Sequence, residues 1–270
     1  AEAEVASEKA QKLLSDIVPS IPIYSRFSVA AVSKKWKNIL TTDKITADNF
    51  WTMMMAEPKD GKMRALNMVL AEEPRNLNPF VASSAYAWQV LGMIYEGMIG
   101  TDPFTLEDMP ALAESWEVRT VGADGAGQTE LSFKIKDNLK WNDGSALTVY
   151  DVKKTIDFLK KNQVPRFYDS VKDVESTEVS ADGKLVVRMS NVSYWHLNKI
   201  GSLPIIPQKV LNEIKDWQNW NPLEKSVDSG PYGLIGSGPF KLETYKAGEY
   251  VMMEKNKYYR MLSNPKRSMK

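Results

Sequence analysis

Two hydrophobic spacings alternate along this chain, and that alternation constrains its fold more than any other feature. In residues 147–162 the apolar side chains recur at helical spacing with lysines between them, which predicts an amphipathic helix. Residues 114–121, 130–136 and 184–190 alternate apolar and polar side chains instead, which predicts half-buried strands. A chain that mixes the two periods in this way is predicted to form an α/β fold.

The same patterns predict further elements on both sides of this region. Helices are predicted over residues 5–16, 83–99 and 210–214, and Ser83 or Ser84 can cap the second. Strands are predicted over residues 20–32, 63–70, 203–207, 240–246 and 250–256. Glycine-containing turns that suit positive φ are predicted at residues 122–127, 142–144 and 181–183.

Composition narrows the classes of function. The chain has 270 residues, of which 43% are hydrophobic and 26% charged, so we expect an ordinary globular core in one large lobe or two subdomains. Thirty-five basic and thirty-four acidic residues give a net charge of +1, which argues against a nucleic-acid partner. The first twenty residues lack the pattern of a signal peptide, so we expect a mature or truncated chain.

No catalytic or metal-binding pattern stands out. The chain has no cysteine, and His196 is its one histidine, which is more often packed or exposed than catalytic. The usual zinc, calcium and phosphate-binding motifs are absent, as is the nucleophile motif of α/β-hydrolases. We therefore expect no cofactor, no metal and no enzyme activity.

Aromatic residues offer the alternative of a binding surface, because rigid rings stack on peptide side chains or sugar rings at small entropic cost. Trp116 and Trp141 lie in strand patterns and are expected in the core. Trp88 and Trp195 stand next to polar turns, so packing and ligand contact remain open for both.

Five separated segments then occur in one order between Leu66 and Tyr259. They are NLNPF, IYEGM, PALAESWEV, LSFKIKDNLKWNDGSALTVYDV and GSGPFKLETYKAGEYVMMEKNKYY. Together they resemble the extracellular solute-binding proteins of the oligopeptide and dipeptide type, family 5, which serve ABC importers. The resemblance implies a type II periplasmic-binding-protein-like lobe, with a mixed central sheet flanked by helices and a smaller α+β subdomain.

The order of the chain departs from that family at its beginning. Residues 10–39 resemble a segment that lies near the C-terminus of family members, and the second lobe expected after residue 260 is missing. We therefore predict one circularly permuted lobe over residues 1–270, with its junction near residues 56–62. A core subdomain from residues 1–82 and 200–262 and an inserted α+β subdomain from residues 83–199 are expected, with residues 20–32 in the same sheet as residues 64–70 and 238–256.

The resemblance also implies where a solute would lie. The ligand-facing wall would come from the segment after the first strand, the start of the next helix and the GSGPF crossing, with Trp195 added by the aromatic argument. The predicted contacts are Asn78, Phe80, Ser84, Tyr86, Trp88, Trp195, Ser237 and Phe240. Gly236 and Gly238 are predicted hinge residues; a tight backbone turn is the alternative for the glycines and a rigid turn for Asn78.

The resemblance implies a binding protein outside the cytoplasmic membrane, in the periplasm or anchored at the cell surface in the parent protein. It would capture a peptide-like or oligosaccharide-like solute and deliver it to the membrane subunits of an ABC importer. One lobe alone is expected to bind weakly and to self-associate through its exposed cleft face. The alternatives are a protein-interaction or structural domain derived from such a lobe, and an enzyme.

Overall fold

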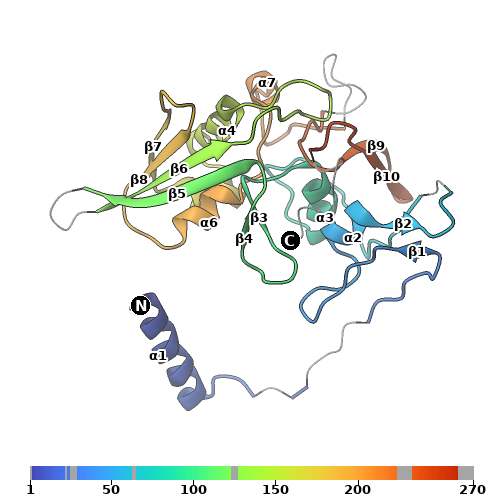
Figure 1. Cartoon of the computed structure of the whole chain (residues 1–270), viewed down its shortest axis with the longest axis horizontal. Helices are drawn as coiled ribbons and strands as arrows, with labels where there is room; N and C mark the ends of the chain where they lie inside the picture. Colours follow the sequence, from blue (N-terminus) through green and yellow to red (C-terminus); the bar gives the residue numbers. More distant parts are fainter. Residues whose placement is uncertain are drawn as a thin grey trace. The chain divides into compact units, whose positions relative to one another are not determined.

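The residues with the strongest helical pattern in the sequence form helix α4, Val149–Lys161 (Figure 1). Its start is fixed by Asp151, whose carboxylate accepts hydrogen bonds from the backbone N–H of Thr148 at 2.8 Å and of Gln208 at 2.8 Å. The apolar stripe of α4 is buried against a sheet of four strands. This packing confirms the helix predicted over residues 147–162.

In the four-stranded sheet the strands run in the spatial order β5-β6-β8-β7, and every neighbouring pair is antiparallel. The strands are β5, Ala113–Val121; β6, Gln128–Ile135; β7, Val174–Val179; and β8, Leu185–Met189. The predicted strands at residues 114–121, 130–136 and 184–190 are therefore confirmed. Leu131, Phe133, Leu185 and Val187 are fully buried beneath α4, because alternate residues of a strand share one face.

The structure, a computed structural model, describes residues 2–21, 23–24, 29–62, 65–122, 127–223 and 233–260. The turn predicted at residues 122–127 lies mostly outside the described residues, whereas Gly144 and Gly183 have the positive φ predicted for their turns. The other helices are α1, Glu2–Ile17; α2, Phe50–Met55; α3, Ala85–Ile94; α5, Pro165–Val171; α6, His196–Gly201; and α7, Gln208–Glu213. The other strands are β1, Trp36–Lys37; β2, Glu57–Pro58; β3, Ile99–Thr101; β4, Asp108–Pro110; β9, Phe240–Lys246; and β10, Tyr250–Lys255.

The chain divides into two compact units, residues 1–33 and 34–270. The first unit contains α1, which confirms the helix predicted over residues 5–16, and the described side chains of this helix are exposed. In the second unit β1 pairs with β2, β3 with β4, and β9 with β10, each pair antiparallel. All strand pairs in the described residues are antiparallel, so no parallel pairing of the predicted mixed sheet is found among them.

Three predicted strands are not found. The described parts of residues 20–32 and 63–70 form no strand. Residues 203–207 are buried as expected, but Pro204 and Pro207 cannot donate to a ladder, and the segment forms no strand. Among the described residues, β9 and β10 pair only with each other, and the predicted permutation stays a prediction. The predicted subdomain boundaries and the junction near residues 56–62 stay predictions.

Asn78 fastens the segment before α3 to a loop of the last third of the chain. Its side chain is fully buried, and Nδ2 donates to the carbonyl oxygens of Trp217 at 2.8 Å and Trp220 at 2.9 Å. Its Oδ1 accepts from the backbone N–H of Phe80 at 2.9 Å. The ring of Phe80 lies 5.9 Å from that of Trp220 and 6.3 Å from that of Trp217, so polar and aromatic contacts hold the same two segments together.

The Asn78→Ala variant is expected to lower the free energy of unfolding by about 2–4 kcal/mol, because buried groups left without a partner cost about 1–3 kcal/mol each. Urea unfolding followed by tryptophan fluorescence measures the change. Asn212→Ala is the matched control, because Asn212 is exposed on α7; its effect should stay within about 0.5 kcal/mol. Equal urea midpoints for the two variants would contradict the role of Asn78 in joining these two segments.

Candidate functional site

The predicted solute contacts fall into a buried group and an accessible group. Asn78 and Phe80 are 0% and 1% exposed, and the side-chain amide of Asn78 is engaged within the chain. Ser237 is 4% exposed, and its hydroxyl is buried without a hydrogen-bond partner. These three residues therefore present almost no surface to solvent, whereas Phe240, at the start of β9, is partly buried.

The accessible group lies at the start of α3. The Oγ of Ser84 accepts from the N–H of Tyr86 at 3.2 Å and caps the helix, which confirms Ser84 as the predicted cap. Tyr86 and Trp88 are partly exposed. The indole N–H of Trp88 donates to the carbonyl of Ala82 at 2.8 Å, and the guanidinium of Arg166 lies 4.3 Å from the ring centroid. Trp88 is thus a fixed aromatic plate with a cation on it.

The crossing segment, residues 233–239, is buried and lies directly against the end of α3. A Cβ on Gly236 would overlap the carbonyl oxygen of Ile94, and a Cβ on Gly238 would overlap that of Met93. The N–H of Gly238 donates to the carbonyl of Ile94 at 2.8 Å. Neither glycine has a positive φ, so close backbone approach explains them. Their predicted role as a hinge stays a prediction.

Gly238→Ala is expected to lower the free energy of unfolding by about 1–3 kcal/mol, because the added methyl must displace a helix backbone. Gly92→Ala is the matched control on α3, where the added Cβ would meet open space; it should raise stability by up to about 1 kcal/mol through helix propensity. Thermal unfolding followed by circular dichroism separates the two. A Gly238→Ala protein as stable as the unchanged protein would show that the contact can relax.

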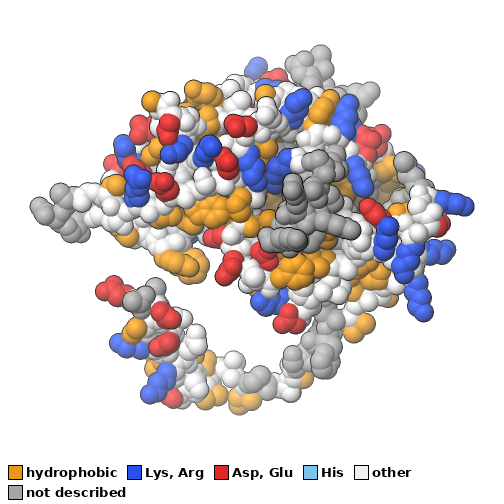
Figure 2. All heavy atoms as spheres, in the orientation of Figure 1, with side chains coloured by type: hydrophobic (Ala, Val, Ile, Leu, Met, Phe, Trp, Pro, Cys, Tyr) orange, Lys and Arg blue, Asp and Glu red, His pale blue; other side chains and the backbone are white. Residues whose placement is uncertain are grey.

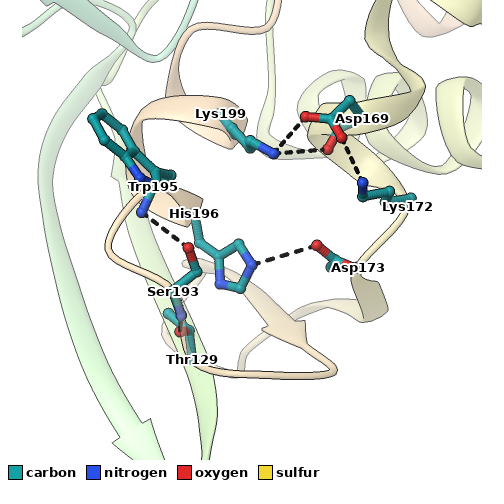
Figure 3. A network of polar contacts seen from close by, with 8 residues as sticks. All are labelled: Thr129, Asp169, Lys172, Asp173, Ser193, Trp195, His196 and Lys199. Carbon is teal, nitrogen blue, oxygen red and sulfur yellow. Dashed lines mark hydrogen bonds and ion pairs between the residues drawn. The ribbon is translucent and has the colours of Figure 1, made fainter. Parts of the chain in front are cut away.

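Trp195 belongs to a different surface. It is 63% exposed at the start of α6 (Figure 3). Its ring lies 5.3 Å, between centroids, from that of Tyr194, which is 81% exposed. Its backbone N–H donates to Oγ of Ser193 at 3.3 Å. Among the described residues no hydrogen bond or ring contact connects this pair to the residues at the start of α3.

His196, the first residue of α6, is buried, with 2% exposure (Figure 3). Its Nε2 lies 3.8 Å from the carboxylate of Asp173, and Nδ1 has no hydrogen-bond partner. Burial lowers the pKa of His196, and the Asp173 carboxylate acts in the opposite direction. The packed position is one of the two expected from the sequence, and the hydroxyl side chains of Ser193 and Thr129 are drawn beside the imidazole in Figure 3.

The single histidine gives a sharp pH test. Because its folded pKa lies below the ordinary value of 6.5, the folded state binds fewer protons than the unfolded state. The free energy of unfolding should therefore be fully retained above pH 6.5 and fall as the pH drops below that value. His196→Gln should flatten this slope. Urea titrations across the interval measure it, and identical slopes in the two proteins would contradict the assignment.

A pocket of about 360 Å³ opens on the other side of α3, and the sequence did not predict it. Its walls come from residues 45–51, the end of α3 with the β3–β4 hairpin, and residues 259–260. Most of the lining is apolar, and its polar side chains include Asn49, Thr101, Asp102 and the ion pair of Glu96 with Arg260. Such a cavity with few polar groups is the usual form of a small-molecule site.

The ion pair is almost completely buried. Nη1 of Arg260 lies 2.7 Å from each carboxylate oxygen of Glu96, and the hydroxyl of Tyr259 donates to Oε1 at 3.2 Å. Burial and then the Glu96 carboxylate raise the pKa of Tyr259 well above its ordinary value. Burial opposes the charge on Arg260, but Glu96 outweighs it and keeps the pKa of Arg260 raised. One signal could have found this pair: Glu96 is the single charge in the apolar run of residues 93–99.

These arrangements suit binding better than catalysis. Within the described residues no group of three or more histidine or carboxylate side chains is placed to hold a metal ion. Over the same residues no helix combines the length and the apolar character that a bilayer crossing requires. Glu96 and Arg260 are already paired with each other, so they can orient a ligand but are not poised as acid and base.

Comparisons with known proteins point in one direction. Residues 107–268 match the model of the bacterial extracellular solute-binding proteins, family 5 middle. The chain is 27% identical over 205 residues to the dipeptide-binding protein DppE of Bacillus subtilis, covering 69% of this chain and 35% of that protein. The chain spans about a third of the length of the curated relatives that it matches.

Two solved structures show the same fold. NikZ of Campylobacter jejuni, in complex with Ni(L-His), aligns with a TM-score of 0.55 and 23% identity over 70% of this chain and 35% of that one. OppA of Haemophilus influenzae, in complex with RPPGFSPFR, aligns with a TM-score of 0.55 and 22% identity over 70% of this chain and 37% of that one. At these identities the likeness concerns the fold alone.

Proposed function

The chain belongs to the family 5 bacterial extracellular solute-binding proteins, and from this premise we propose that it forms part of the solute-binding component of an ABC importer. The family match over residues 107–268 is the observation that carries the proposal. The predicted fold class, an α/β periplasmic-binding-protein-like lobe, is confirmed by the same match and by the solved neighbours. The protein captures its solute outside the cytoplasmic membrane and is not an enzyme.

The solute is a peptide-like molecule in this proposal, with an oligosaccharide as the other class. A relative is named for dipeptide binding, and a structural neighbour holds a peptide, which favours the first class. The partly exposed rings of Tyr86 and Trp88 at the start of α3 provide stacking surfaces, and Ser84 adds a polar group. The buried residues Asn78 and Phe80 hold this wall in place.

Transport in the whole protein proceeds by closure of two lobes on the solute, followed by docking of the closed form on the membrane subunits of the importer. Gly236 and Gly238 lie at the crossing segment, where the proposed hinge would be. A parent protein anchored at the cell surface would present both lobes to the same solute. One lobe by itself loses about half of the contacts, so a binding free energy near −8 kcal/mol falls to about −4 kcal/mol, which is millimolar. An uncovered wall of this kind also favours self-association through the cleft face.

Amide chemical shifts during titration with trialanine or with a chitotriose sugar test the proposal directly. We expect millimolar affinity for the peptide, with shifts centred on the start of α3. Tyr86→Ala should weaken these shifts, whereas Tyr150→Ala, which removes a tyrosine that is 56% exposed on α4, should leave them unchanged. Chemical-shift changes centred on the pocket beside Glu96 would place the solute site there instead of at the start of α3. No response to either solute would refute the proposed function. Micromolar affinity would refute the proposal that a second lobe supplies about half of the solute contacts.

A further inference from the structure

The outer side of β5 has no strand beside it in the part of the chain that the structure describes. β5 forms one edge of the four-stranded sheet, and its one ladder is with β6. At the first residue the N–H of Ala113 donates to the carbonyl of Met98 at 3.0 Å, so the covered part of the edge ends there. From Glu114 to Val121 the strand offers its backbone groups to another chain.

On the face of the sheet that packs on the core, the side chains become less buried at β5. In the ladder Trp116 is opposite Phe133 and Val118 is opposite Leu131. Phe133 and Leu131 are fully buried, whereas Val118 is 51% exposed. Figure 2 shows hydrophobic side chains beside charged side chains of both signs over the region where Figure 1 places β5 and α6. An additional strand beside β5 would continue the covered face.

The other face of β5 carries two opposite charges on either side of Val118. Glu117 and Arg119 form an ion pair at 2.6 Å, with their side chains 54% and 65% exposed. If a second copy of β5 pairs antiparallel with Val118 opposite Val118, then each Glu117 lies opposite the Arg119 of the other copy. The same register sets Trp116 opposite Thr120. Opposite charges and aromatic with β-branched residues are favourable cross-strand pairs.

The neighbouring registers are penalised by the same charges. If the centre of the pair moves from Val118 to residue 117, Glu117 lies opposite Glu117. If it moves to residue 119, Arg119 lies opposite Arg119. Like charges directly opposite one another destabilise a pair of strands. The charge pattern therefore selects one register of a symmetric pair. The opposite edge strand, β7, contains Glu175 and Glu178 and no basic residue, so it lacks this self-complementarity.

We propose that two copies of this chain associate through β5, joining their four-stranded sheets into one antiparallel sheet of eight strands across a twofold axis. The occupant of the edge is a second copy because the charges of β5 are complementary to themselves. Symmetric pairing of β5 with itself closes at a dimer through this surface, and the expected self-association through the cleft face would be a separate contact. This surface differs from the cleft wall at the start of α3, and the inference does not depend on the proposed function.

Sedimentation velocity over a wide concentration series tests the dimer. The unchanged protein should show a monomer–dimer equilibrium, and Arg119→Glu should raise the dimer dissociation constant roughly tenfold or more, because both cross-strand pairs become repulsive. The double variant Glu117→Arg/Arg119→Glu restores opposite charges and should restore the dimer. Restoration excludes misfolding as the reason for the loss in the single variant.

Lys246→Glu is the matched control, because Lys246 forms an exposed ion pair with Glu249 in the β9–β10 hairpin; it should leave the dimer unchanged. A monomer at every concentration would overturn the proposal. A dimer that is insensitive to Arg119→Glu would also overturn it and would place the contact elsewhere, for instance at the cleft wall. A dimer lost in the single variant but not restored in the double variant counts against the proposed register.

Discussion

The backbone contact between residues 233–239 and the end of α3 is the constraint on which the rest of the second unit depends. Gly236 and Gly238 let this segment approach the carbonyl oxygens of α3 more closely than any side chain would allow. The carbonyl of Gly236 accepts from the N–H of Asn142 at 2.9 Å, so the same segment also holds the turn before α4. One crossing thereby connects α3, the turn that precedes α4 and the β9–β10 hairpin.

The two candidate binding features lie on α3 because of that contact. The start of the helix presents Tyr86 and Trp88, and its end supplies part of the pocket that contains Glu96. The buried pair of Glu96 with Arg260 brings residue 260 to a position beside the end of α3. A buried ion pair is worth little to stability when compared with apolar residues of similar size, but removal of one partner is costly, so such a pair fixes register. Residues 45–51 reach the same pocket, which ties the beginning of the second unit to the rest through packing and without a shared sheet.

Local patterns predicted the elements that have a partner close by in the chain. The helix at α4 and the strands β5, β6, β8, β9 and β10 were predicted because each has a clear period and pairs with or packs on a sequence neighbour. The segment at residues 203–207 has the composition of a strand, yet its buried residues serve as core without a ladder. The short helices α2, α5 and α6 were missed, because their six or seven residues show no apolar spacing that distinguishes them from loops, whereas the equally short α7 was predicted over residues 210–214. Asn78 stays a predicted solute contact, and no pattern in the sequence revealed that its side-chain amide donates to the carbonyl oxygens of Trp217 and Trp220.

The sequence by itself determined the family and the α/β class, because motif order and hydrophobic period are properties of the chain alone. Only the tertiary structure decided which of the predicted contacts are accessible, that Glu96 meets Arg260, and that β5 lies at an open edge. Each of these depends on distances between residues far apart in the chain. Exposure and pairing follow from what lies across a contact, and a linear sequence does not contain that information until the core has packed.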